Sequence, residues 1–135
     1  MTTTVTTTVS PWTWQDAFGY SQSVAVRSPE VTVYVAGQAS IDADGTFLHA
    51  GDMAGQVGQV LDNVETVLAA HDLTLADVVS YAVHTTDVDA YLPASGQVAE
   101  RFAAHGRLPA GEILCEVQRL ALPPMLAEIG VVAAR

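Results

Sequence analysis

The stretch DMAGQVGQVLDNVETVLAAH, residues 52–71, carries the clearest pattern in the chain. Its apolar side chains recur every three to four residues, with Gln59, Asp62 and Glu65 between them. This is the spacing of a helix that buries one face. Asp52 has a side chain suited to cap the first turn. The stretch therefore predicts a helix from Asp52 to about His71.

The segments before this helix are expected to be extended. Residues 24–26 and 31–35 alternate valine with other residues, and Ser28-Pro29-Glu30 between them is a turn sequence. Residues 3–9 are rich in threonine and valine, which favour an edge strand or a frayed tail. Asp44-Gly45 predicts a further tight turn.

The segment after the helix predicts a strand over residues 78–85, preceded by a short capped turn at residues 74–77. Side chains alternate between the two faces of a strand. We expect Val79, Tyr81 and Val83 to face the helix, and Ser80, Ala82 and His84 to face away from it.

A second helix is predicted from Asp89, as its cap, to His105, with Pro93 in its first turn and Gly106 at its end. Two last strands are expected at about residues 112–119 and 125–133. The order β-β-α-β-α-β-β predicts an α+β fold, with one mixed β-sheet and two helices on one face. We expect one domain over residues 1–135, with residues 1–17 as an N-terminal strand or extension.

Composition points to self-association and excludes some partners. Half of the 135 residues are apolar and 15% are charged, so a copy of the chain is the simplest cover for the exposed apolar surface. Five Lys and Arg against fifteen Asp and Glu give a net charge of −10, which disfavours nucleic acid and anionic membranes. With one cysteine, Cys115, and no signal sequence or membrane-length apolar run, the expected location is the cytoplasm.

Six short motifs occur together in the order and spacing of one known family. They are Val35-Ala-Gly-Gln38, Leu61-Asp-Asn-Val64, Thr86-Asp-Val88, Leu108-Pro-Ala110, Glu116-Val-Gln-Arg-Leu120 and Ala127-Glu-Ile129. The ordered set resembles the Rid family, also called YjgF (reactive intermediate imine and enamine deaminases), over about residues 18–134. Ser10-Pro-Trp12 and Gly19-Tyr-Ser21 resemble a subgroup distinct from the best-known deaminases.

The resemblance implies a chorismate-mutase-like α+β domain that assembles as a homotrimer, with ligand clefts between subunits. Well-known members hydrolyse reactive imines or enamines to a keto acid and ammonia, without a metal or an organic cofactor. In them an arginine binds the substrate carboxylate, and a glutamate near the C-terminus handles the water.

Most of these groups are replaced in this chain, which makes it an atypical member. The arginine position falls on Gly111 or on Glu112, because one extra residue lies between the flanking motifs. The C-terminal glutamate position is Gly130, the pocket serine position is Ala36 and the pocket asparagine position is Ser95. The aromatic hydroxyl is retained as Tyr20. Without the arginine, a carboxylate substrate loses its bidentate partner.

Strand alternation suggests which polar groups remain near a cleft. If Cys115 and Val117 face the helices, then Glu112, Leu114 and Glu116 face the open side of the sheet, with His84 in the same sense on its own strand. The candidate catalytic residues are Glu112, His84, Tyr20 and Glu116, which offer acid/base chemistry. The candidate substrate-binding residues are Trp12, Ala36, Ser95, Gly111, Leu114 and Gly130. The histidines show no ligand spacing, so we expect no metal and no cofactor.

Each candidate also has a structural interpretation. Glu116 is equally suited to accept backbone N–H bonds or to pair with an arginine. Glu112 fits a solvated loop at the start of a strand, His84 an interface hydrogen bond, and Tyr20 a packing role.

The expected activity is therefore acid/base conversion of a small imine, enamine or reactive carbonyl compound in an inter-subunit cleft of a homotrimer. The alternative is a non-catalytic module that binds a small molecule or a partner on the same scaffold. A third possibility is ordinary imine deamination, with Arg101, Arg107 or Arg119 replacing the missing arginine.

Overall fold

The computed structural model describes residues 4–135, and its best-packed element is helix α1, Met53–Ala69. The Asp52 side chain accepts a hydrogen bond from the backbone N–H of Gly55, as the sequence predicts for an N-cap. Five apolar side chains along one stripe of α1 are fully buried: Val57, Val60, Leu61, Val64 and Leu68. The predicted helix and its inward face are confirmed.

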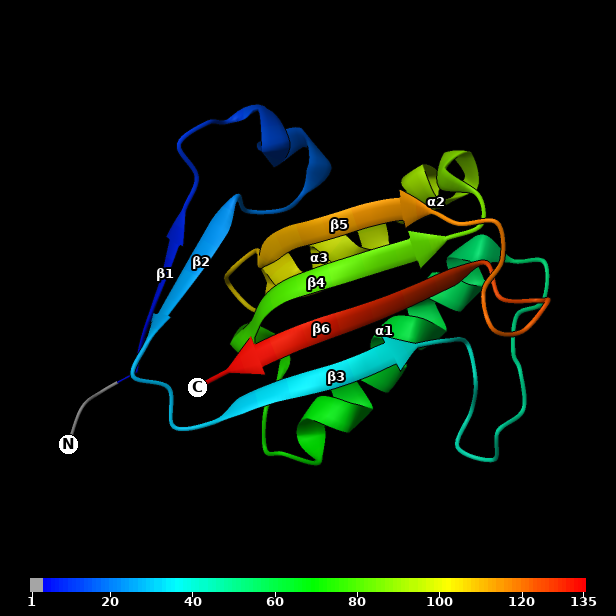
Figure 1. The fold of residues 1–135 in the computed structure, drawn as a ribbon, viewed down its shortest axis with the longest axis horizontal. Coiled ribbons are helices and arrows are strands. Elements are labelled where there is room, and N and C mark those ends of the chain that lie inside the picture. The colour runs from blue at the N-terminus through cyan, green and yellow to red at the C-terminus, as the bar shows by residue number, and fades with distance from the viewer. Residues whose placement is uncertain (1–3) are drawn as a thin grey trace.

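The main sheet has four strands in the order β3-β6-β4-β5. They are β3, Thr32–Gln38; β4, Val78–Thr85; β5, Ala110–Glu116; and β6, Ala127–Ala134. Strand β6 pairs antiparallel with both β3 and β4, and the β4–β5 pair is parallel, so the sheet is mixed as predicted. Strand β5 forms one edge (Figure 1).

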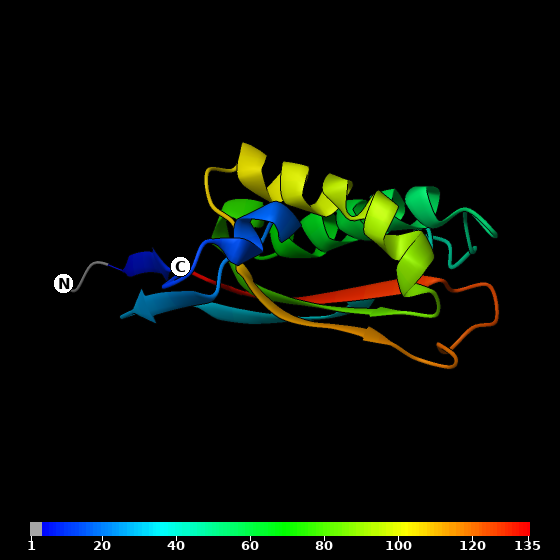
Figure 2. The ribbon, with the colours of Figure 1, turned by 90° about the horizontal axis from the view of Figure 1, so that it is seen from above.

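All helices lie on one face of the main sheet, as Figure 2 shows from above. Val33 and Val35 of β3, and Ile129, Val131 and Ala133 of β6, bury their side chains beneath the helices. The opposite, helix-free face carries Tyr34, which is 79% exposed. Among the described residues, no helix is both long enough and apolar enough to cross a membrane.

The alternation expected for β4 holds for Tyr81 and Val83 but not at its start. Val78 is the buried residue, whereas Val79 is half-buried, because the pairing with β6 shifts between Val78 and Ser80. The turn before the strand is confirmed as a 3-10 helix, Leu75–Asp77, closed by reciprocal hydrogen bonds with Thr74.

The second predicted helix is two helices, α2 (Val88–Ala94) and α3 (Gly96–Ala104), that meet at Ser95. Asp87 rather than Asp89 is the N-cap, and its side chain accepts from the Ala90 N–H. Pro93 therefore lies near the end of α2, not in its first turn. A proline inside a helix has no N–H to donate to the preceding turn, and its ring crowds the carbonyl of that turn. This accounts for the break between α2 and α3 close to Pro93.

The strand predicted at residues 24–26 was expected to belong to the one mixed sheet, and this part of the prediction is wrong, whereas the strand predicted within residues 3–9 is present. Strands β1 (Val5–Val9) and β2 (Ser23–Arg27) pair with each other as a separate antiparallel sheet. Between them lies a 3-10 helix, η1 (Trp14–Phe18), so the predicted extension of residues 1–17 holds β1 and most of η1. Residues 1–3 of that extension lie outside the described residues.

Candidate active site

A cleft of about 820 Å³ opens between η1, the α2–α3 junction and the first half of β5. Four of the predicted polar or small site residues line it: Tyr20, Ser95, Gly111 and Glu112. Leu114, also predicted, lines it as well. The other lining residues are Trp14, Asp16, Ala17, Phe18, Gly19, Tyr81, Val83, Tyr91, Leu92, Gly96, Val98, Ala99 and Ile113.

Glu112 lies at an irregularity in β5. Along the parallel pair, Gly111 is opposite Tyr81 and Ile113 is opposite Ala82, so Glu112 is an extra residue in the strand. A bulge of this kind redirects a side chain and interrupts the alternation. Glu112 thus lies in the segment whose register the sequence motifs left open. Glu112 is exposed and lines the cleft, rather than lying in the loop before the strand.

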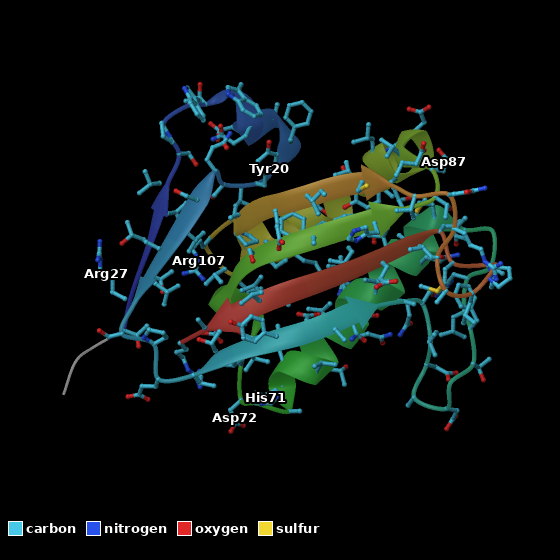
Figure 3. All side chains as sticks on the ribbon, in the orientation of Figure 1. Tyr20, Arg27, His71, Asp72, Asp87 and Arg107 are labelled. Carbon is cyan, nitrogen blue, oxygen red and sulfur yellow. The ribbon has the colours of Figure 1, made fainter. Side chains whose placement is uncertain are left out.

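Tyr20 lies directly over Gly111. A Cβ atom built on Gly111 would be 2.8 Å from the Cγ and Cδ2 atoms of the Tyr20 ring. Ser21 fixes this segment, because its N–H and Oγ donate to the carbonyls of Pro109 and Leu108, at 3.0 and 2.7 Å. A side chain at position 111 is therefore incompatible with the present place of Tyr20. Figure 3 labels Tyr20 beside β5.

Two further tyrosines form the floor of the cleft. Tyr81 packs against Phe102, with ring centroids 5.4 Å apart, and Tyr91 is only 3% exposed. Burial, and to a lesser degree the neighbouring Tyr20, raises the pKa of Tyr81 to about 12. Burial and then Tyr81 also raise the pKa of Tyr91. Both phenols therefore remain protonated at neutral pH and can act as hydrogen-bond donors.

The outer wall of the cleft is η1, and a buried glutamine anchors it. Gln15 is 1% exposed, and its Nε2 donates to the Trp12 carbonyl at 2.8 Å. Gly19 ends the segment with a φ of 73°, and a Cβ there would lie 2.5 Å from the Ala99 Cβ on α3. The segment is thus fixed against α3 and leaves Trp14 and Phe18 more than half exposed.

Trp12, a predicted binding residue, does not line the cleft but supports its rim. Its ring stacks on Trp14, with centroids 6.4 Å apart and an interplanar angle of 26°. Trp14 in turn meets Tyr20 edge-on, at 6.5 Å. Ser95 lies at the helix junction, where its Oγ donates to the Leu92 carbonyl at 2.7 Å.

Comparisons with known proteins identify the family. A family model described as Endoribonuclease L-PSP matches residues 14–135. The solved structure of YyfB from Yersinia pestis, described as a conserved Rid-family protein of unknown function, is 31% identical with a TM-score of 0.85. The match covers 96% of this chain and 98% of that one. The chain belongs to the Rid (YjgF) family.

Other relatives have a similar degree of sequence identity to this chain. A RutC family protein of Sulfurisphaera tokodaii is 31% identical over 116 residues, which is 86% of this chain and 87% of that protein. The YjgF structure from E. coli is 27% identical with a TM-score of 0.69, and the match covers 86% and 87% of the two chains. The resemblance found in the sequence motifs is confirmed at the level of family and fold.

Two of the candidate catalytic residues lie outside the cleft of this Rid chain. Leu114 and Glu116 pair with the buried Val83 and Thr85, so they face the helices, contrary to the expected alternation. His84 faces the helix-free side, where its strand neighbours are Cys115 and Glu128. The assumption that Cys115 points inward fails because β5 is an edge strand beside the cleft, where core packing does not select the inward residue.

Glu116 has the structural role that the sequence left open for it. Its Oε1 accepts a hydrogen bond of 3.0 Å from the backbone N–H of Val88, at the start of α2. Ala36 and Gly130 are likewise outside the cleft lining. Gly130 lies on the helix-free face opposite Ala82. A Cβ atom built on Gly130 would lie 3.4 Å from the Val35 carbonyl oxygen and 3.6 Å from Gly37.

The arginines proposed as substitutes are engaged elsewhere. Arg101 donates to Asp62 at 2.6 Å and to Glu65 at 3.1 Å, both on α1. Arg107 donates to the carbonyls of Ala76 and Val78, at 2.8 and 3.0 Å. Arg119 is exposed in the segment between β5 and β6. None of the three lines the cleft.

The sequence analysis missed several lining residues. Tyr81 and Tyr91 follow core spacing on their elements, and the sequence does not reveal that they also line a cleft. The two tryptophans on either side of Thr13 predict cover for the core or for the edge of a cleft, and Trp14 does line the cleft. Asp16 has no such signal. Among residues 4–135 no group of three or more His, Cys, Asp or Glu side chains is arranged to hold a metal ion.

Proposed function

We propose that this Rid chain is an enzyme that converts a small imine, enamine or reactive carbonyl compound in the cleft by acid/base chemistry. The observation that carries the proposal is the shared lining of Glu112, a carboxylate, and Tyr20, a phenol, in a cleft large enough for a small molecule. A carboxylate and a phenol together supply a proton acceptor and a proton donor.

For an imine, the reaction would be hydrolysis to a carbonyl compound and ammonium. Glu112 takes a proton from water as the water oxygen bonds to the protonated imine carbon, which gives a neutral carbinolamine. The same carboxyl then returns the proton to the nitrogen. The C–N bond breaks as the hydroxyl oxygen forms the C=O bond, and the hydroxyl proton passes to the departing ammonia. Charge and atoms balance, because one cation and one water give one carbonyl and one ammonium.

Tyr20, Tyr81 and Tyr91 would orient the substrate in this scheme. The hydroxyls of these residues can donate hydrogen bonds to a developing carbonyl or hydroxyl oxygen. Such chemistry needs correct placement and a proton carrier, and requires neither a metal nor an organic cofactor.

The assembly proposed for this activity is a homotrimer with the cleft at a subunit boundary. Exposed apolar residues border the cleft: Trp12, Trp14, Phe18, Leu92, Ile113 and Leu114. A second copy over this rim would shield the cleft from bulk solvent. RNA is a poor fit despite the description of the family model, since the net charge is −10 and the cleft lacks basic side chains.

The test is imine hydrolysis, followed as loss of semicarbazide-trapped imine when purified protein is added. Imines without a carboxylate are made in situ by an amine oxidase, and 2-imino acids by an amino-acid oxidase. We expect acceleration of the first class, reduced about 10²- to 10⁴-fold in Glu112→Gln. Glu30→Gln, which removes the same charge from an exposed turn, is the control. Full activity in Glu112→Gln would remove Glu112 from the mechanism.

The second candidate is a non-catalytic binding module on the same scaffold. It is favoured by the loss of His84 and Glu116 from the cleft, which leaves fewer proton carriers than the sequence suggested. A compound that binds the cleft and is recovered unchanged after hours with the protein would support this alternative.

A further inference from the structure

The side chains that line the cleft carry negative charge without a balancing positive charge. Asp16 and Glu112 both line it, and it has no Lys, Arg or His among its lining residues. The five Lys and Arg residues of the chain are all arginines, and none of them lines the cleft. Arg101 is paired with carboxylates of α1, and Arg107 donates to backbone carbonyls. The two carboxylates therefore have no cationic side chain within the lining to balance them.

The rim of the cleft is aromatic, and its rings are held in place. Trp14 is 56% exposed yet stacks on Trp12 and meets Tyr20 edge-on, while the buried Gln15 anchors the backbone between them. The negative face of an aromatic ring attracts a cation, and fixed rings do so without losing side-chain freedom on binding.

We propose that the cleft selects an organic monocation, a small molecule with an ammonium or iminium nitrogen, which Glu112 and the rings of Trp14 and Tyr20 recognise together. Asp16 adds negative potential at the same opening. This deepens the proposed function by naming its substrate class, and it rests on the cleft being the site of that function. A protonated imine carries its positive charge on the reacting C=N group, so the recognised atom would also be part of the reacting one.

The same features disfavour the alternatives. An anionic ligand would meet two carboxylates and no partner, which costs binding energy as well as leaving its own charge unpaired. An uncharged aromatic ligand could stack on Trp14 but would gain no charge–charge attraction to Glu112.

The test uses three probes of nearly equal size: benzylammonium, benzyl alcohol and benzoate. The chain has two tryptophans, and both belong to the stacked rim, so tryptophan fluorescence reports on this site. At constant ionic strength we expect benzylammonium to bind about tenfold more tightly than benzyl alcohol, and benzoate more weakly than either.

Variants separate the two recognition elements. Glu112→Gln is expected to weaken benzylammonium about tenfold and to leave benzyl alcohol unchanged. Trp14→Leu should weaken benzylammonium about two- to fivefold, measured by calorimetry because it removes a fluorophore. Glu30→Gln, with the same change of net charge outside the cleft, should bind all three probes as the original chain does.

The proposal is overturned if benzoate or benzyl alcohol binds as well as benzylammonium, if Glu112→Gln leaves the preference intact, or if none of the probes binds at millimolar concentration. These outcomes are distinct from failure of the proposed function. Cation selectivity without any imine turnover would leave this inference standing and remove catalysis. Imine turnover by a cleft that does not distinguish the three probes would support catalysis and overturn this inference.

Discussion

Tyr20 and Gly111 are in such close contact that position 111 has no room for the side chain of an arginine. The Tyr20 ring occupies the space that the first carbon of any side chain at position 111 would need. An arginine there would have to displace the ring, and the ring is held by the Trp14 contact and by the hydrogen bonds of Ser21. An arginine at position 111 is therefore incompatible with the present place of Tyr20.

This close approach predicts the effect of Gly111→Ala. A methyl group 2.8 Å from the ring must move Tyr20 or the strand, so we expect the free energy of unfolding to fall by about 1–3 kcal/mol. Gly96→Ala is the control, since a Cβ at Gly96 meets nothing within 4 Å, and it should be neutral or slightly stabilising. The measurement is urea unfolding of each variant. A Gly111→Ala protein as stable as the original would show that Tyr20 is not fixed.

The residues that the family resemblance assigns to one site only partly coincide with the lining of the cleft, since Ala36 and Gly130 lie outside it. The family alignment placed Tyr20, Ser95, Gly111 and Glu112 at one site, and the fold does so. The alternation of side chains along β5 predicted that Glu116 lies with these residues, and this prediction is wrong. Alternation is informative only where one face packs on the core, and β5 is an edge strand interrupted at Glu112.

Among the elements, those with local chemical signals could be predicted and those that depend on distant contacts could not. Asp52 and Thr74 cap the segments that the sequence assigned to them. The pairing of β1 with β2 away from the main sheet carries no such signal, because valine and threonine pair equally well with either neighbour. The start of α2 also depends on a distant residue, since Glu116 reaches it from β5.

That contact predicts a stability role for Glu116. Glu116→Ala removes the acceptor of the Val88 N–H and should lower the free energy of unfolding by about 0.5–2 kcal/mol, as for a lost helix cap. Glu116→Gln keeps an acceptor oxygen and should cost less than half as much. Thermal unfolding of the pair gives the comparison. If Glu116→Gln instead abolished imine hydrolysis with stability unchanged, a catalytic role for Glu116 would have to be restored.

For the whole molecule, the arrangement of layers leaves a large surface without a partner in one chain. Helices cover one face of the main sheet, and the other face is bare (Figure 2). Tyr34 lies on that bare face opposite Val132 and is 79% exposed. With half of the residues apolar and few charges to spread over the surface, burial of this face against copies of the chain is the arrangement that composition and fold favour together.

We therefore expect light scattering after size exclusion to give about three times the 14.2 kDa mass of one chain at micromolar concentration. Tyr34→Asp places a charge in the buried face and should shift the mass toward that of one chain, since an unpaired buried carboxylate opposes association. Ala54→Asp adds the same charge to the exposed first turn of α1, outside that face, and should leave the trimer intact. Because the cleft is proposed to lie at a subunit boundary, Tyr34→Asp should also lose imine hydrolysis while keeping its helical circular dichroism. A monomeric original chain with full activity would contradict both the trimer and the shared cleft.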